Sequence, residues 1–260
     1  MSKVQRKELW RVFLKNERKE LLTTYIEKNK VKNKVNLYCT IDIAEILITV
    51  INILDEFELN VCIVDHSEER LLLQCFAGSE KTLRSKVVYK KSHIYDENLY
   101  LNNSGIYDVE LHYYMCTDNT YISCENNDGS NYLFLNADKR QAYRLFNHIR
   151  LKDKECLNTK VVLVNCVDNQ EWFLSLLAVF DSFERFIISD IYELFVDKQD
   201  AYYFCEVRNA VESADMFKTS EQCRQVIKSL CAAAGLSEFS IYKIFNKKSI
   251  QYKNRMENSN

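Results

Sequence analysis

Residues 35–54 read VNLYCTIDIAEILITVINIL, a stretch that begins as a strand and continues as the most apolar helix candidate in the 260-residue chain. The first part, VNLYCT, predicts a short strand, and Asp42 can cap the helix after it, which the apolar pattern extends to about Leu59. The helix is too short to span a bilayer, and Asp42, Glu45 and Asn52 also make it too polar to do so. The stretch therefore predicts a soluble protein in which helices pack on a sheet.

The elements on either side predict an α+β protein with a mixed or antiparallel sheet flanked by helices, and with basic helical termini. In the first half, apolar spacing indicates an amphipathic helix over residues 5–29, a hairpin formed by NVCIVD and RLLLQCFA, and a β-meander over residues 109–135. In the second half it indicates strands over residues 185–196 and 201–208 and a helix over residues 212–234. Asn136 is the expected cap of the helix that follows residue 136.

The segment LKDKECLNT, residues 151–159, is the nearest thing to a domain boundary in the sequence. We therefore expect a basic amphipathic helix over residues 1–34, an α+β domain with the meander over 35–150, and a second α+β part over 160–260.

Composition excludes several kinds of site. The chain has no proline and four glycines, and neither GxGxxG nor GxxxxGK[ST] occurs, which argues against a P-loop or a dinucleotide-binding loop. The ten cysteines form no CxxC pair and mostly lie in apolar runs, so we expect buried free thiols. The four histidines are scattered, with His66 in a polar turn. The sequence predicts no metal site and no cofactor, and favours a protein that is not an enzyme.

Charge is strongly segregated along the chain. Residues 1–34 carry 11 Lys and Arg against 4 Glu, and residues 217–260 carry 8 against 3. Since the whole chain has a net charge of −2, the middle carries −14. Basic ends predict a polyanion partner such as nucleic acid, whereas the acidic middle predicts a basic protein partner. The charged first residues lack the apolar core of a signal peptide, which predicts an intracellular protein.

The C-terminal stretch AAAGLSEFSIYKIFNKK, residues 232–248, carries the strongest local signal. Gly235 suits a tight turn after a helix, and Ser237 can cap a second helix. The spacing A-G-L-S-x-x-S-I-Y-x-x-F-x-x-K resembles the helix-turn-helix of the TetR and AraC families of bacterial regulators, over about residues 224–250. The segment FSIYKIF is also rich in strand-forming residues, so a closing β-strand is the alternative.

The resemblance implies a nucleic-acid-binding, regulatory protein that favours DNA. Residues on the first turns of the second helix would face base edges: Glu238, Phe239, Ser240 and Lys243. Other residues would reach phosphates: Ser237, Tyr242, Lys247 and Lys248. Lys253 and Arg255 in the tail would add salt-sensitive attraction. The helix is also expected to turn Phe239, Ile241, Tyr242 and Phe245 back onto the protein.

The strand alternative leads to an enzyme hypothesis. Its order of elements resembles the PD-(D/E)xK nuclease core, which holds a divalent metal between an Asp on one strand and E-x-K on the next. Asp190 would be the first ligand, with Glu171 as a further carboxylate. Glu206-Val207-Arg208 would replace E-x-K, with Arg208 where the pattern has Lys. A third hypothesis is a non-catalytic interaction module of the immunity, antidefence or assembly type.

Overall fold

The computed structural model describes residues 33–77, 86–102, 107–115, 122–124, 129–136, 138–151, 156–165, 178, 185–210 and 219–245. The basic segments at residues 1–32 and 246–260 lie outside this range, and with them the predicted amphipathic helix. None of the described helices is long and apolar enough to cross a membrane.

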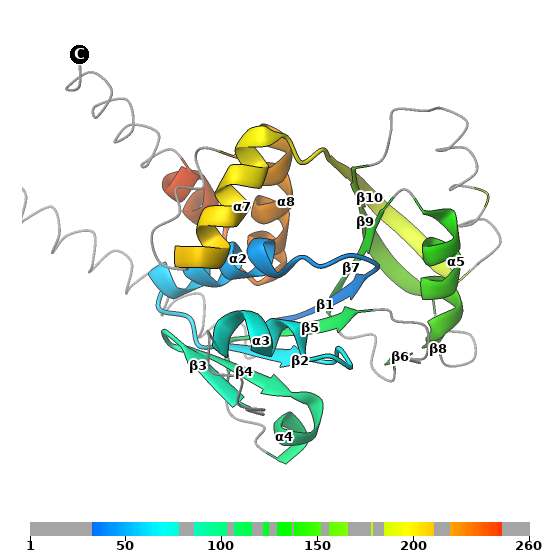
Figure 1. Ribbon diagram of the computed structural model, residues 1–260, viewed down its shortest axis with the longest axis horizontal. Helices are drawn as coiled ribbons and strands as arrows, with labels where there is room; N and C mark the ends of the chain where they lie inside the picture. The colour runs from blue at the N-terminus through cyan, green and yellow to red at the C-terminus, as the bar shows by residue number, and fades with distance from the viewer. Residues whose placement is uncertain are drawn as a thin grey trace, which may run out of the picture.

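The described strands build an eight-stranded mixed sheet and a small two-stranded one, and helices cover both faces of the larger sheet (Figure 1). The strands of the large sheet, in spatial order, are β10 (Phe186–Leu194), β9 (Leu157–Val164), β7 (Ser130–Leu135), β1 (Asn33–Cys39), β5 (Val109–Met115), β2 (Val61–Asp65), β4 (Ser92–Asp96) and β3 (Lys86–Tyr89). The small sheet pairs β6 (Ile122–Cys124) with β8 (Ile149–Leu151) in parallel.

The described residues form seven helices. They are α2 (Ala44–Glu56), α3 (Leu71–Ala77), α4 (Glu97–Asn102), α5 (Lys139–His148), α7 (Lys198–Ala210), α8 (Glu221–Ala233) and a helix over residues 238–245.

The predicted mixed sheet flanked by helices is confirmed, and its pairing is mainly parallel. Only β3 runs antiparallel, to β4; every other neighbouring pair in the large sheet is parallel. β7 pairs with β9, so the sheet takes strands from both sides of residues 151–159. The two predicted parts of the chain therefore share one sheet.

Two predicted antiparallel arrangements are wrong. β5 and β7 do not pair in a meander, because β1 lies between them and is parallel to both. The predicted hairpin fails because Leu71–Ala77 is a helix. Asp65, at the end of β2, accepts hydrogen bonds from the backbone N–H groups of Leu72 and Leu73 at 2.9 and 3.2 Å. These bonds satisfy N–H groups that a first helical turn leaves open, so the chain starts a helix and not a return strand.

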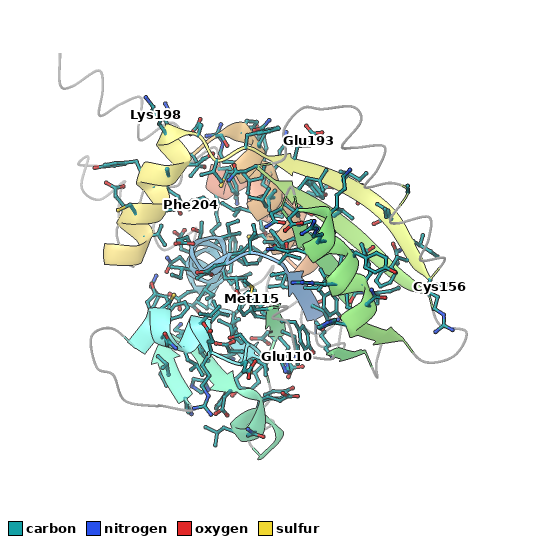
Figure 2. All side chains as sticks on the ribbon, turned by 45° about the vertical axis from the view of Figure 1, so that its right-hand side comes forward. Glu110, Met115, Cys156, Glu193, Lys198 and Phe204 are labelled. Carbon is teal, nitrogen blue, oxygen red and sulfur yellow. The ribbon has the colours of Figure 1, made fainter. Side chains whose placement is uncertain are left out.

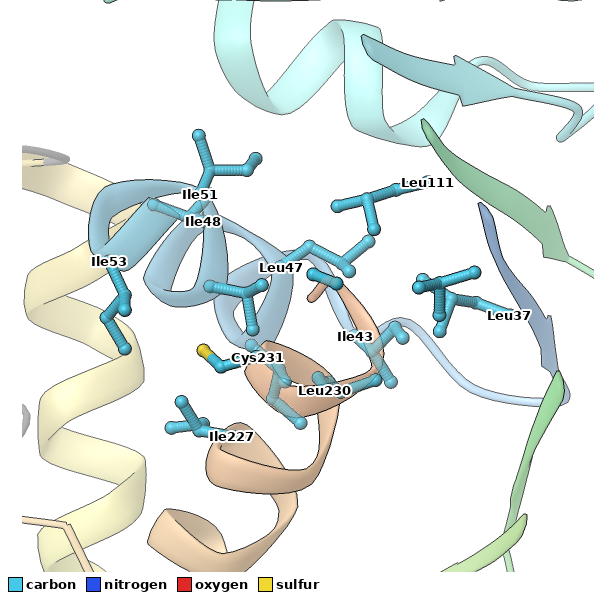
Figure 3. Packing of buried hydrophobic residues seen from close by; sticks show 14 of the residues in the cluster. Leu37, Ile43, Leu47, Ile48, Ile51, Ile53, Leu111, Ile227, Leu230 and Cys231 are labelled. Atoms are coloured by element: carbon cyan, nitrogen blue, oxygen red, sulfur yellow. The ribbon is translucent and has the colours of Figure 1, made fainter. Parts of the chain in front are cut away.

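One face of the sheet carries the larger core. Leu37 on β1 and Leu111 on β5 contact a layer in which α2 and α8 pack together (Figure 3). α2 is buried on most sides because it lies between the sheet and the helices α7 and α8, which explains its nearly continuous apolar sequence. The opposite face is covered at β7 and β9 by α5, through Ala142, Leu145 and Phe146.

Cysteine burial follows the prediction in part. Cys39, Cys62, Cys223 and Cys231 are buried free thiols, whereas Cys156 and Cys205 are exposed.

Candidate functional site

The C-terminal segment folds as two helices joined by a tight turn. α8 ends at Ala233, and Gly235 follows with a φ of 95°, in the region that favours glycine. Ser237 then caps the helix over residues 238–245, because its Oγ accepts the backbone N–H of Ser240 at 3.2 Å. Of the two alternatives left by the sequence, the helix is correct and the closing strand is wrong.

One side of this last helix is anchored in the protein. Leu236, Ile241, Ile244 and Phe245 are buried and belong to the larger core. Lys228 on α8 places its Nζ 4.9 Å from the centre of the Phe245 ring. The helix is therefore held against α8 by its apolar side and by a cation–π contact.

The other side presents aromatic rings to solvent. Phe239 is 57% exposed and Tyr242 is 67% exposed, so the expectation that these two rings pack inward is wrong. Lys243 lies beside them, with its Nζ 4.7 Å from the centre of the Phe239 ring. Large exposed rings next to a cation form a surface able to stack on bases or pack on a partner.

The structure places most of the predicted nucleic-acid contacts on or beside this exposed side. Ser237, Glu238, Phe239, Tyr242 and Lys243 are exposed. Ser240 is half-buried, and its Oγ lies 2.9 Å from the Oγ of Ser237, so it forms part of the helix cap. Lys247, Lys248, Lys253 and Arg255 lie outside the described residues.

The residues of the nuclease hypothesis do not have the expected arrangement. Asp190 lies on β10, is half-exposed, and faces Lys160 at 3.7 Å. Glu206 and Arg208 belong to the helix α7, so the predicted strand over residues 201–208 is wrong. Glu171 lies outside the described residues. The described residues also hold no group of three or more His, Cys, Asp or Glu side chains that could bind a metal ion.

A pocket that the sequence did not predict opens at the carboxyl ends of the parallel strands. From β1 the chain passes through α2 to β2, on one side of β1, whereas from β7 it passes through α5 to β9, on the other side. α2 and α5 cover opposite faces of the sheet. The neighbouring strands β1 and β7 thus form a topological switch point, where open α/β sheets commonly bind ligands.

The pocket at this switch point has a volume of about 460 Å³, within the range of small-molecule sites. Its walls come from the loops after β1, β7, β9 and β10, and from Phe204 on α7 (Figure 2). Ile43, Ile46, Val164 and Leu194 give it an apolar base. Because these loops are far apart in sequence, no local sequence motif predicts the pocket.

The polar lining of the pocket is acidic. It contains the carboxylates of Asp42, Glu45 and Asp138 and the amides of Asn136 and Asn165, with no Lys or Arg among the described lining residues. Asp42 accepts the backbone N–H of Ala44 at 2.9 Å, at the start of α2.

At α5 the predicted cap is wrong, because Asp138 and not Asn136 caps the helix, accepting the N–H of Arg140 at 2.9 Å. A helix N-terminus at a switch point commonly binds phosphate. Here a carboxylate of the chain already bonds to each of the two helix starts, and the resulting negative charge favours a cation.

Comparisons with known proteins find matches among solved structures but none by sequence. No protein-family model matches the chain, and no curated protein matches it. Among solved structures, the chain is similar to the MinD cell division protein of Aquifex aeolicus, with a TM-score of 0.42 and 10% sequence identity. That match covers 75% of this chain and 96% of the MinD chain.

Proposed function

We propose that the protein binds nucleic acid through the exposed side of the helix over residues 238–245. The observation that supports this is the placement of Phe239, Tyr242 and Lys243 on the solvent side of a helix whose other side is buried. A side chain on an anchored helix loses little conformational freedom on binding, which favours a preorganised recognition surface. The basic segments at both ends of the chain would add salt-dependent attraction to phosphates.

The test is binding of fluorescently labelled duplex and single-stranded DNA, followed by anisotropy at several salt concentrations. Phe239→Ala and Tyr242→Ala should each weaken binding by about tenfold, the loss expected for one stacked base. Lys243→Glu should weaken binding and reduce its dependence on salt, because it replaces a positive charge at the DNA surface with a negative one.

Lys91→Glu is the matched control, since it makes the same charge change on an exposed residue in the turn between β3 and β4. Equal losses for Lys91→Glu and Lys243→Glu would mean that the helix is not the binding surface. Binding of single strands with no binding of duplex would contradict a helix-turn-helix role. No binding of either, with a stoichiometric protein partner, would favour the interaction module.

The pocket at the switch point supports a second candidate function, binding of a small cationic molecule. Its carboxylates favour a cation, and its apolar base suits the carbon chain of an amine. Spermidine is a suitable probe, with ATP as the anionic comparison. Spermidine should raise the melting temperature, whereas ATP should not.

Asp42→Asn and Asp138→Asn remove the charges while keeping side chains that can cap a helix. Both variants should abolish the shift caused by spermidine. Glu68→Gln, an exposed acid outside the pocket, should keep it. A larger shift with ATP, or an equal spermidine shift in all variants, would exclude the pocket as a cation site.

A further inference from the structure

Two histidines that lie 46 residues apart in sequence meet at the carboxyl ends of β2 and β5. His66 directly follows β2, and His112 lies on β5; His66 Nε2 is 3.0 Å from His112 Nδ1. Their ring planes lie within 18° of each other with centres 5.3 Å apart, and the Tyr114 ring stacks on His66 with centres 4.1 Å apart. The backbone N–H of His66 donates to the carbonyl of Tyr113 at 2.9 Å, which fixes the position of the ring.

The outer nitrogen of each histidine faces a carboxylate. His66 Nδ1 lies 3.5 Å from Glu97 Oε1 on α4, and His112 Nε2 lies 3.9 Å from Glu110 Oε2 on β5 (Figure 2 labels Glu110). Glu110 also accepts a hydrogen bond from the hydroxyl of Tyr100 on α4, at 2.6 Å. The side chains of His66 and His112 are 10% and 7% exposed, so water hydrates their outer nitrogens only weakly.

These contacts require a particular number of protons on the two imidazole rings. One proton lies between His66 Nε2 and His112 Nδ1, and each outer nitrogen needs a proton of its own to face a carboxylate favourably. Two neutral histidines supply only two protons, which leaves one lone pair directed at a carboxylate. Three protons on the four nitrogens satisfy every contact, so the pair is complete when it carries one positive charge.

The geometry points to His66 as the ring that carries the charge, because its outer nitrogen lies 3.5 Å from a carboxylate and that of His112 lies 3.9 Å from one. Burial is the main cause that lowers the pKa of His112, and Lys34 on β1 lowers it further, although Glu110 acts in the opposite direction. The contact with His66 is the main cause that lowers the pKa of Glu97. The ordered chain is then Glu97, cationic His66, neutral His112, Glu110 and Tyr100.

Other nearby acids are engaged elsewhere. Asp65 accepts hydrogen bonds from Ser67 and from the N–H groups at the start of α3, and burial is the main cause that raises its pKa. Asp96 pairs with Arg70 at 3.0 Å.

We propose that His66 and His112 form a proton-dependent latch that holds α4 against β2 and β5. α4 has only six residues, and its apolar attachment is Leu99 and Tyr100 against Cys62, Val64 and Tyr95. Glu97 at its first position joins it to the histidine pair. Loss of the third proton removes this attachment but leaves the Tyr100–Glu110 hydrogen bond, so α4 loosens without unfolding the sheet.

Hydrogen exchange of the α4 amides between pH 5.5 and 8.5, corrected for the intrinsic rate, tests the latch in the full chain. The opening equilibrium of residues 97–102 should increase about threefold to tenfold across the range in which histidine titrates, the size expected for a charge-assisted bond to a half-exposed acid. Glu97→Gln and His66→Gln should both remove this pH dependence. Glu68→Gln, in the same loop as His66, should retain it. An unchanged pH dependence in Glu97→Gln would overturn the proposal, as would protection of α4 that rises with pH.

Long-range proton–nitrogen NMR spectra of the imidazoles give an independent readout that does not require α4 to move. At pH 6 His66 should carry protons on both nitrogens, and His112 should carry one, on Nε2. A cationic His112, or two neutral rings, would overturn the proton assignment. If chelators such as EDTA abolish protection of α4 at every pH, a metal and not a proton holds the helix, and the latch is wrong.

Discussion

At the residue scale, two glycines occupy positive-φ positions for different reasons. Gly129 has a φ of 124°, and a Cβ atom on it would overlap the carbonyl oxygen of Lys34 in the neighbouring strand β1. Gly235, with a φ of 95°, is required by the turn between two helices. Side chains are strained in both places, but only at Gly129 would a side chain push two paired strands apart.

The two positions should therefore respond unequally to alanine. We expect Gly235→Ala to lower the free energy of unfolding by about 1 to 2 kcal/mol, the usual cost of the left-handed backbone for a residue with a Cβ. Gly129→Ala should cost about 2 kcal/mol more, because overpacking against β1 adds to that strain. Urea unfolding followed by circular dichroism measures both values. A Gly129→Ala protein as stable as Gly235→Ala would contradict the predicted overlap.

Residue-level prediction worked where the signal was local. Gly235 and Ser237 have the turn and capping roles that their neighbours in sequence indicate, whereas the N-cap of α2 is Ile43 and Asp42, one residue before it, bonds to the N–H of Ala44. The pairing of His66 with His112 could not be predicted, because it depends on β5 lying beside β2 in the sheet. The sequence of a polar turn carries no signal for the distant strand that packs against it.

At the element scale, the errors have one cause, which is packing that overrides the intrinsic preference of the residues. AYYFCEVR is rich in strand-forming residues, yet it forms part of α7. Tyr203 and Val207, four residues apart, are both buried, and the hydroxyl of Tyr203 bonds to Thr49 on α2 at 2.7 Å. Thr49 already donates to the carbonyl of Glu45 at 2.8 Å, so Tyr203 is the donor in this contact. A helix brings Tyr203 and Val207 within about 6 Å of each other on one face, whereas a strand would set them about 13 Å apart.

In the helix over residues 238–245, packing likewise overrides the strand preference of the residues. FSIYKIF has high strand preference, but Ile241, Ile244 and Phe245 have the three- and four-residue spacing of one helix face, and all are buried. The strand β10 shows the opposite outcome, because Phe186–Leu194 was expected to be extended and is.

At the scale of the whole molecule, the mixed sheet flanked by helices could be predicted, whereas its strand order could not. Strand order depends on which crossovers pass over which face, and here β1 separates β5 from β7 in the large sheet although only the short strand β6 lies between them in the chain. The pocket depends on that order, since it lies where α2 and α5 leave β1 and β7 on opposite faces. A site created by topology leaves no motif in a single segment.

The shared sheet leads to a prediction about cooperativity. The larger core combines strands from residues 35–150 with α7 and α8 from residues 160–260, so neither part buries its apolar surface without the other. Unfolding should then be a single transition. Buried thiols report on both parts: Cys39 and Cys62 lie on β1 and β2, and Cys223 and Cys231 lie on α8.

Pulse labelling with N-ethylmaleimide along a urea gradient, read by mass spectrometry of peptides, measures each thiol separately. Burial raises the pKa of Cys223 to about 12 and also raises that of Cys39, so these thiols should not react in the folded protein. Cys156 and Cys205 are exposed and should react without urea, which makes them internal controls. Cys39, Cys223 and Cys231 belong to the larger core, and Cys62 lies on β2, whose Val61 and Ile63 belong to it, so all four thiols should become reactive at one urea midpoint. If Cys39 and Cys62 reacted at a different midpoint from Cys223 and Cys231, the two parts would unfold separately and the shared core would not be the unit of stability.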